Sequence, residues 1–152
     1  MKREELEQKV QKIEGKFPRI VKEVEPFNGA NWGMHWNGGI QDINYIETLD
    51  YQVAAARWNK HSWGEGGGGV KWTDWISVYY KRKDSQEKIK KVDTEKIVTR
   101  DQYDPKKDRT DLWGYNNASL EKIEDNKIRT SWANSECEKK LSYIIDLDKE
   151  EK

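Results

Sequence analysis

The sequence is poor in cysteine and carries no excess of either charge. Its 152 residues contain one cysteine, and 28 basic side chains balance 28 acidic ones. The lone Cys137 cannot form an internal disulfide and is typical of a reducing compartment, so we expect a cytoplasmic protein. The charge balance excludes a domain built mainly to hold a phosphate backbone, and it does not favour a nucleic-acid partner.

Long hydrophobic runs are also missing. Apolar residues make up 34% of the chain, and the first sixteen residues, MKREELEQKVQKIEGK, are charged throughout. No stretch is apolar enough for a signal peptide or a transmembrane helix, so we expect no membrane partner. The length is that of one domain, which we predict over residues 1–147, followed by a disordered tail at residues 148–152.

The short motifs of common cofactor sites are absent as well. The sequence has no P-loop, no G-x-S-x-G and no C-x-x-C, and its two histidines lack metal-ligand spacing. The glycine run Gly66–Gly69 is not followed by the Lys-Ser/Thr pair that a phosphate loop needs. We therefore expect no cofactor and no metal, although the many carboxylates leave a glycosidase-type pair open.

Tryptophan is abundant, with eight residues against two phenylalanines, and several lie in a segment that predicts a long β-hairpin. Two extended arms within Tyr51–Lys83 flank the loop Gly64–Gly69. If the loop closes symmetrically, Trp63 lies opposite Val70. The second arm alternates as a half-buried strand does, with Val70, Trp72, Ile76, Val78 and Tyr80 on one face.

A helix competes with the first arm. Ile46, Leu49, Val53 and Ala56 also follow helical spacing, and the run of three alanines favours a helix. We predict a strand because the second arm needs a pairing partner.

The rest of the chain predicts a mainly β fold behind one or two N-terminal helices, an α+β arrangement. We expect helices at residues 2–14 and between residues 17 and 27, then an irregular loop at 28–39. Alternation and turn residues predict strands at 40–49, 97–103, 119–124, 127–133 and 140–147. These strands predict a curved antiparallel sheet or a small barrel, with a β-sandwich as the alternative.

The hairpin register predicts an inward-facing polar cluster. Arg57, Asn59, His61 and Asp74 fall on the face that also carries the apolar residues of the second arm, together with Trp63 and Trp72. Buried polar groups need hydrogen-bond partners, so the cluster predicts a pocket for a polar ligand. Arg57 and Asp74 satisfying each other as a buried ion pair is the alternative.

The opposite face of the hairpin predicts an aromatic surface. Trp58 lies opposite Trp75, beside Tyr79 and small residues, and open indole faces suit sugar rings or a partner protein. The spacing of Trp58 and His61 is repeated by Trp32 and His35, and Trp36 follows the latter. The repeat indicates two histidines near one ligand, or two histidines packed in an aromatic core.

These patterns lead us to expect a non-enzymatic binding domain for a small polar-aromatic ligand or a glycan. One alternative is a protein-interaction or inhibitor module whose exposed tryptophans contact another protein. A second alternative is a small hydrolase that uses His35 or His61 with a carboxylate. The only feature that resembles a nucleic-acid site is the basic patch of Lys81–Lys83, Lys88, Lys90 and Lys91, and a solvated face explains it equally well.

Overall fold

The computed structural model describes residues 3–24, 39–63, 70–101, 118–134 and 139–151 of the chain. Two helices, α1 (Arg3–Glu14) and α2 (Ile20–Glu23), precede the strands. The strands are β1 (Gly39–Glu47), β2 (Tyr51–Trp63), β3 (Val70–Arg82), β4 (Lys90–Asp93), β5 (Ile97–Asp101), β6 (Ala118–Glu124), β7 (Lys127–Asn134) and β8 (Lys139–Asp146), and a short helix α5 (Leu147–Glu150) follows them. The predicted mainly β fold with N-terminal helices is confirmed.

The strands form two antiparallel sheets. Sheet A has the order β1-β2-β3, and β4 and β5 both pair with the remaining edge of β3. Sheet B has the order β6-β7-β8. Thr94 joins the two short strands to β3, because its hydroxyl accepts the Ile76 N–H at 3.0 Å and its own N–H donates to the Ile76 carbonyl at 2.8 Å. The described strands do not close into a barrel, so that form of the prediction is wrong.

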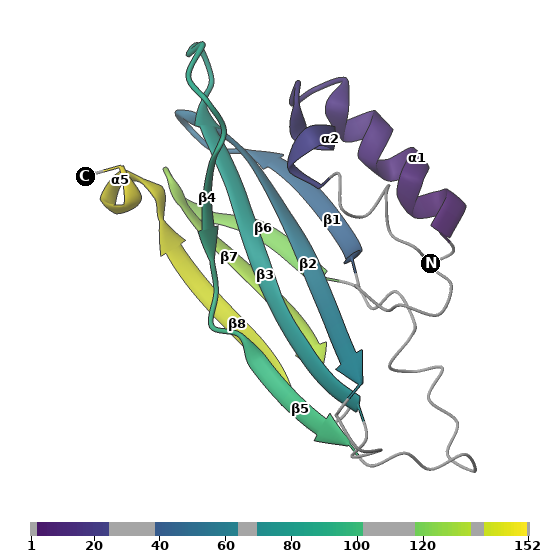
Figure 1. Cartoon of the computed structure of the whole chain (residues 1–152). Helices are drawn as coiled ribbons and strands as arrows, with labels where there is room; N and C mark the ends of the chain where they lie inside the picture. The colour runs from purple at the N-terminus through teal and green to yellow at the C-terminus, as the bar shows by residue number, and fades with distance from the viewer. Residues whose placement is uncertain (1–2, 25–38, 64–69, 102–117, 135–138, 152) are drawn as a thin grey trace.

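Sheet A is the middle layer, with the helices on one face and sheet B on the other (Figure 1). Leu6, Val10 and Ile13 of α1 recur at helical spacing, and all three are buried against the first face. The second face packs on sheet B through residues that include Val53, Val78, Ile128 and Trp132. Each face of sheet A therefore has its own hydrophobic core.

The central strand β2 explains the alanine run that also suggested a helix. All residues from Val53 to Arg57 are buried, because both faces of β2 are covered. Ala54 and Ala56 pack toward the helices, whereas Ala55 packs toward sheet B. Packing on two sides thus overrides the helical propensity of alanine, and the helical alternative for residues 46–60 is wrong.

The hairpin has the symmetric register that we predicted. The backbone of Trp63 pairs with Val70, and that of Asn59 pairs with Asp74. A bulge between Ile40 and Asp42 interrupts the pairing of β1 with β2. Among the described side chains, the register places odd-numbered residues of β2 and even-numbered residues of β3 against sheet B, and this placement builds the candidate site.

Asn126, in the turn between β6 and β7, connects sheet B to the turn between β1 and β2 of sheet A through hydrogen bonds. Its side-chain oxygen accepts hydrogen bonds from the Thr48 hydroxyl at 3.1 Å and the Asp50 N–H at 2.9 Å. Its amide nitrogen donates to Asp50 at 2.7 Å and to Asp148 at 3.2 Å. Asn126 is 5% exposed, and both ends of its amide have partners.

The tail that we expected to be disordered contains helix α5. Leu147 is fully buried in the core between the sheets. Asp146 caps the helix by accepting the Asp148 N–H at 3.1 Å, and Lys90 contacts Glu151 at 2.6 Å. One apolar anchor and one cap therefore order a segment whose composition indicated disorder. None of the described helices has the length and apolar character needed to cross a membrane.

Candidate functional site

A polar cluster lies on the face of sheet A that meets sheet B. Arg57 and Asn59 of β2 and Asp74 of β3 are 4%, 5% and 6% exposed. They continue the face of the apolar residues Ala55 and Ile76 toward the hairpin loop: Arg57 and Asn59 lie two and four residues after Ala55, and Asp74 lies two residues before Ile76. The layer between the sheets is therefore apolar along most of β2 and polar where it approaches the hairpin end.

The three side chains contact one another through a single carboxylate oxygen. Asn59 Nδ2 donates to Asp74 Oδ1 at 2.9 Å, and Arg57 Nη2 reaches the same oxygen at 3.4 Å. The second distance is at the long limit for a hydrogen bond. The ion pair that we considered as an alternative thus forms, but it engages only one of the three guanidinium nitrogens.

Trp132 of β7 completes the cluster from the opposite sheet. The Arg57 guanidinium carbon lies 4.7 Å from the centre of the Trp132 ring, within the range of a cation–π contact. Trp132 is 2% exposed. We did not predict this residue as part of the site. The alternation of Ile128, Thr130 and Trp132 in sequence predicts that they share a face, but it does not say which face of sheet A they meet.

Three nitrogen atoms of this cluster have no hydrogen-bond partner in the part of the chain that the structure describes. They are Arg57 Nε, Arg57 Nη1 and Trp132 Nε1. All three carry hydrogens and none can accept, so what they lack is acceptors. Leaving a buried donor unpaired costs roughly 1–3 kcal/mol. The fold therefore holds several donors together at a cost to its stability.

Burial dominates the electrostatics of the cluster. Burial lowers the pKa of Arg57, and the nearby Asp74 and Asp42 carboxylates oppose this shift. Burial also raises the pKa of Asp74, against the hydrogen bonds from Asn59 and Arg57. Arginine remains charged because its ordinary pKa lies above 12. The Arg57 cation is thus buried between the sheets with one carboxylate contact, while two of its nitrogens have no hydrogen-bond partner among the described residues.

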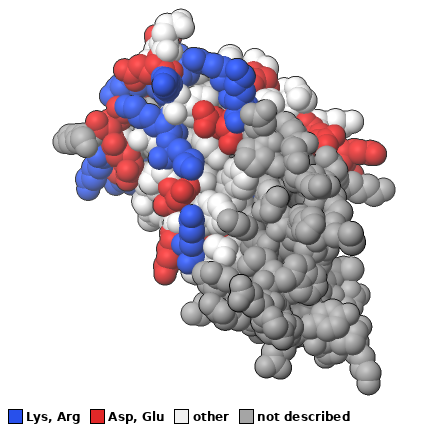
Figure 2. Space-filling view, in the orientation of Figure 1, with Lys and Arg blue, Asp and Glu red and all other residues white. Residues whose placement is uncertain are grey.

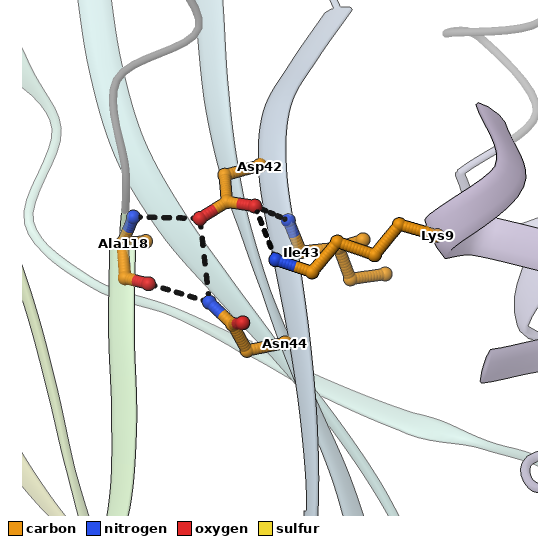
Figure 3. Close-up of polar contacts among 5 residues, drawn as sticks. All are labelled: Lys9, Asp42, Ile43, Asn44 and Ala118. Carbon is orange, nitrogen blue, oxygen red and sulfur yellow. Dashed lines mark hydrogen bonds and ion pairs between the residues drawn. The ribbon is translucent and has the colours of Figure 1, made fainter. Parts of the chain in front are cut away.

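Asp42 on β1 lies opposite Arg57 in the register but has a very different environment (Figure 3). One oxygen accepts Lys9 Nζ at 2.8 Å and the Ile43 N–H at 2.9 Å. The other accepts the Ala118 N–H at 2.9 Å and Asn44 Nδ2 at 3.3 Å. Helix α1, β1 and β6 meet at this carboxylate, which is 2% exposed and fully hydrogen-bonded. Its role is to join the three layers.

The predicted aromatic pair lies on the other face of sheet A, toward the helices. The Trp58 and Trp75 rings stack with centroids 6.0 Å apart and an angle of 5° between their planes. Trp58 Nε1 donates to the Tyr79 hydroxyl at 3.2 Å, and Trp75 Nε1 donates to the Ser77 hydroxyl at 3.1 Å. Lys96 Nζ lies 4.8 Å from the Trp75 ring centre.

These contacts leave the aromatic pair half-buried instead of exposed. Trp58 also packs against the core beneath the helices. Stacking and the Lys96 contact occupy ring faces that a sugar would need. The pair therefore resembles a packed structural element more than an open binding surface.

Several predicted site residues cannot be placed. Trp32, His35 and Trp36 lie outside the described residues. His61, Trp63 and Trp72 belong to β2 and β3, but their side chains lie outside the described part. A site shared by the two histidines thus stays a prediction. In the described ranges, no group of three or more histidine, cysteine, aspartate or glutamate residues could hold a metal ion.

The predicted basic patch is interrupted by acidic partners. Lys90 contacts Glu151 at 2.6 Å, and Lys91 lies 3.8 Å from Asp93. Figure 2 shows basic and acidic side chains intermixed over the described part of the surface in view. An intermixed surface is typical of a solvated face and gives no support to a nucleic-acid site.

Comparison with known proteins assigns neither a family nor a function to this chain. No protein-family model matches the sequence, and no curated protein or solved structure matches the chain at a significant level.

Proposed function

We propose that the protein is a non-enzymatic binding domain that holds a small polar-aromatic ligand between its two sheets, at Arg57 and Trp132. The observation that carries the proposal is the unpaired state of Arg57 Nε and Nη1 in a side chain that is only 4% exposed. Trp132 Nε1 adds a third donor without an acceptor among the described residues. A ligand that supplies acceptors would recover the roughly 1–3 kcal/mol that each unpaired donor costs.

Other buried polar groups of this protein support the distinction between a site and a structural cluster. Asp42 and Asn126 are as buried as Arg57, yet their hydrogen-bonding atoms have partners. These two groups show that the fold can satisfy a buried polar side chain that joins elements, although Gln41 Oε1, also buried, has no partner among the described residues. The two unpaired nitrogens of Arg57 are better explained by a bound ligand that accepts their hydrogen bonds.

The aromatic part of the proposed ligand follows from Trp132 and Arg57 themselves. An indole ring and a guanidinium group both present flat faces, on which a flat ring packs favourably. The indole and guanidinium cover one face of each other, 4.7 Å apart, so the flat ring of a ligand would pack on the opposite face of one of them. A flat ring with acceptor atoms at its edge combines both kinds of contact.

No described contact favours either alternative. A hydrolase that uses His35 or His61 stays a prediction, because both side chains lie outside the described part of the chain. A protein-interaction surface built on Trp58 and Trp75 would need exposed indoles, whereas both are half-buried. The expected cytoplasmic location stays a prediction that rests on the lone Cys137.

The proposal is tested with a ligand screen on a matched pair of variants. Tryptophan fluorescence and native mass spectrometry would detect small aromatic ligands that bind the wild-type protein. The double variant Arg57→Met, Asp74→Asn removes both charges of the cluster while keeping an amide oxygen for Asn59, so it should fold. It should lose the ligands that the wild-type protein binds.

Arg129→Met provides the control. Arg129 lies on β7, as Trp132 does, but it is 43% exposed at its side chain and pairs with Glu121 at 2.9 Å. This variant should bind the same ligands as the wild-type protein. Binding of all ligands by the double variant with unchanged affinity would refute the proposed site.

A further inference from the structure

We infer that the ligand presents a neutral carbonyl group, as in an amide, lactam or imide on a flat ring, and not a carboxylate. This inference rests on the proposed function, because it concerns the same cluster. It follows from which atoms of the cluster lack partners and from the charges that surround them.

The unpaired atoms define the chemistry that the ligand must offer. Arg57 Nε, Arg57 Nη1 and Trp132 Nε1 are all donors, and Trp132 Nε1 has no capacity to accept. A ligand whose polar atoms are mainly donors would leave them unpaired. Carbonyl and carboxylate oxygens both satisfy this requirement, so donor geometry alone does not separate a neutral ligand from an anion.

The charges in and next to the cluster favour a neutral ligand over an anion. Arg57 faces the carboxylate of Asp74 at 3.4 Å, and Lys9 neutralises Asp42 at 2.8 Å. Asp42 and Asp74 both act electrostatically on Arg57. These four charges sum to zero without a ligand. A bound carboxylate would bring this buried group to a net charge of −1, and Arg57 would then have to compensate two carboxylates at once.

Competition for Arg57 leads to the same conclusion. A carboxylate ligand at Nε or Nη1 would be repelled by the Asp74 carboxylate, which already contacts Nη2 of the same guanidinium group. A neutral carbonyl at either nitrogen avoids this repulsion and leaves the contacts of Asp74 with Arg57 and Asn59 in place. The existing arrangement is therefore complementary to an uncharged acceptor.

The test compares matched probes that differ only in charge. Benzamide with benzoate, and nicotinamide with nicotinate, would be titrated into the wild-type protein at neutral pH. Tryptophan fluorescence and chemical-shift changes would give the dissociation constants. We expect each amide to bind at least about tenfold more tightly than its carboxylate, a difference of about 1.4 kcal/mol.

The Asp74→Asn variant makes the test specific to the charge balance. This substitution removes one carboxylate but keeps an oxygen for Asn59 and Arg57. The preference for the amide should shrink or reverse in this variant, because Arg57 then has no compensating charge on β3. A preference that Asp74→Asn leaves unchanged would overturn the charge argument.

The remaining outcomes separate this inference from the proposed function. Carboxylates that bind the wild-type protein as tightly as amides, and lose affinity in Arg57→Met, Asp74→Asn, would overturn the neutral ligand and leave the binding site intact. Failure of every probe, together with an empty ligand screen, would refute the binding function and this inference with it.

Discussion

Asp42 and Arg57 are neighbours across two paired strands, yet the protein treats their charges in opposite ways. Their backbones pair between β1 and β2, and they are 2% and 4% exposed. Asp42 accepts hydrogen bonds from Lys9, Ile43, Asn44 and Ala118. Arg57 makes one long hydrogen bond and leaves two nitrogens unpaired among the described residues.

The difference provides a criterion for telling buried charges that only join elements of this fold from buried charges that bind a ligand. A buried charge that only joins elements should be fully hydrogen-bonded, because each unpaired atom reduces stability. Asp42 meets this criterion, and Arg57 does not. Substitution of Asp42 should therefore reduce mainly the stability of the fold. Substitution of Arg57 should reduce stability less and should abolish ligand binding.

The largest effect is expected for Asp42→Ala. It leaves the Lys9 ammonium, the Ala118 N–H and the Asn44 amide without their shared acceptor. We expect the free energy of unfolding, measured with urea, to fall by about 3–5 kcal/mol.

Lys9→Met is the matched control for Asp42→Ala. Its side chain is 32% exposed, and its loss leaves Asp42 three of its four hydrogen bonds, so Lys9→Met should cost less than Asp42→Ala. A loss in Asp42→Ala no larger than that in Lys9→Met would contradict the view that Asp42 joins the three layers.

A smaller effect is expected at the cluster itself. Arg57→Met leaves the buried carboxylate of Asp74 with only Asn59 among the partners shown, and it should lower the free energy of unfolding by roughly 1–3 kcal/mol. Adding Asp74→Asn removes the isolated charge and should restore most of the loss. Urea unfolding of the two variants measures this recovery, and an additive loss would mean that Arg57 and Asp74 stabilise the fold independently.

Trp132→Phe should have a modest effect on stability and a clear effect on binding. It keeps an aromatic ring against Arg57 but deletes Nε1, which makes no hydrogen bond to a described residue. Only lost contact area should matter, so we expect a stability loss of about 1–2 kcal/mol. Ligand titrations should show a loss of affinity in the same variant, and unchanged affinity would exclude Trp132 Nε1 as a ligand contact.

The smallest effect concerns pH and Asp74. Burial raises the pKa of Asp74, so the folded protein binds a proton more readily than the unfolded chain between the ordinary value near 3.9 and the folded value. The contribution of Asp74 to stability therefore increases as the pH falls through this interval. Asp74→Asn removes this dependence.

Thermal unfolding over a pH series would measure the effect. The wild-type protein should gain stability relative to Asp74→Asn as the pH falls through the folded pKa. A relative loss would show that the hydrogen bonds from Asn59 and Arg57 outweigh burial and lower the pKa of Asp74.

Much of one half of the site could be predicted from the sequence. Side chains alternate along a strand, so the pairing of Trp63 with Val70 was enough to place Arg57, Asn59 and Asp74 on one face. The same alternation placed Trp58 opposite Trp75. Local pattern determines which residues share a face, and that part of the prediction is confirmed.

The other half depends on contacts between distant segments. Trp132 reaches Arg57 only because sheet B packs on this face of sheet A, and no local pattern specifies how two sheets stack. The burial of Trp58 depends in the same way on the N-terminal helices. Helix α5 was missed because the charged composition of the tail conceals the single anchor Leu147.

The central claim is that the donors of Arg57 and Trp132 are unpaired in the free protein and become paired on binding. Proton–nitrogen NMR spectra of the tryptophan Nε1 and arginine Nε groups test this directly, with Trp132→Phe and Arg57→Met to assign the signals. On addition of benzamide or nicotinamide, both signals should move together toward the shifts of hydrogen-bonded groups. The Trp58 Nε1 signal should not move, because that atom already donates to Tyr79. Signals of Arg57 and Trp132 that are already at hydrogen-bonded shifts in the free protein, and do not respond to any probe, would contradict the account.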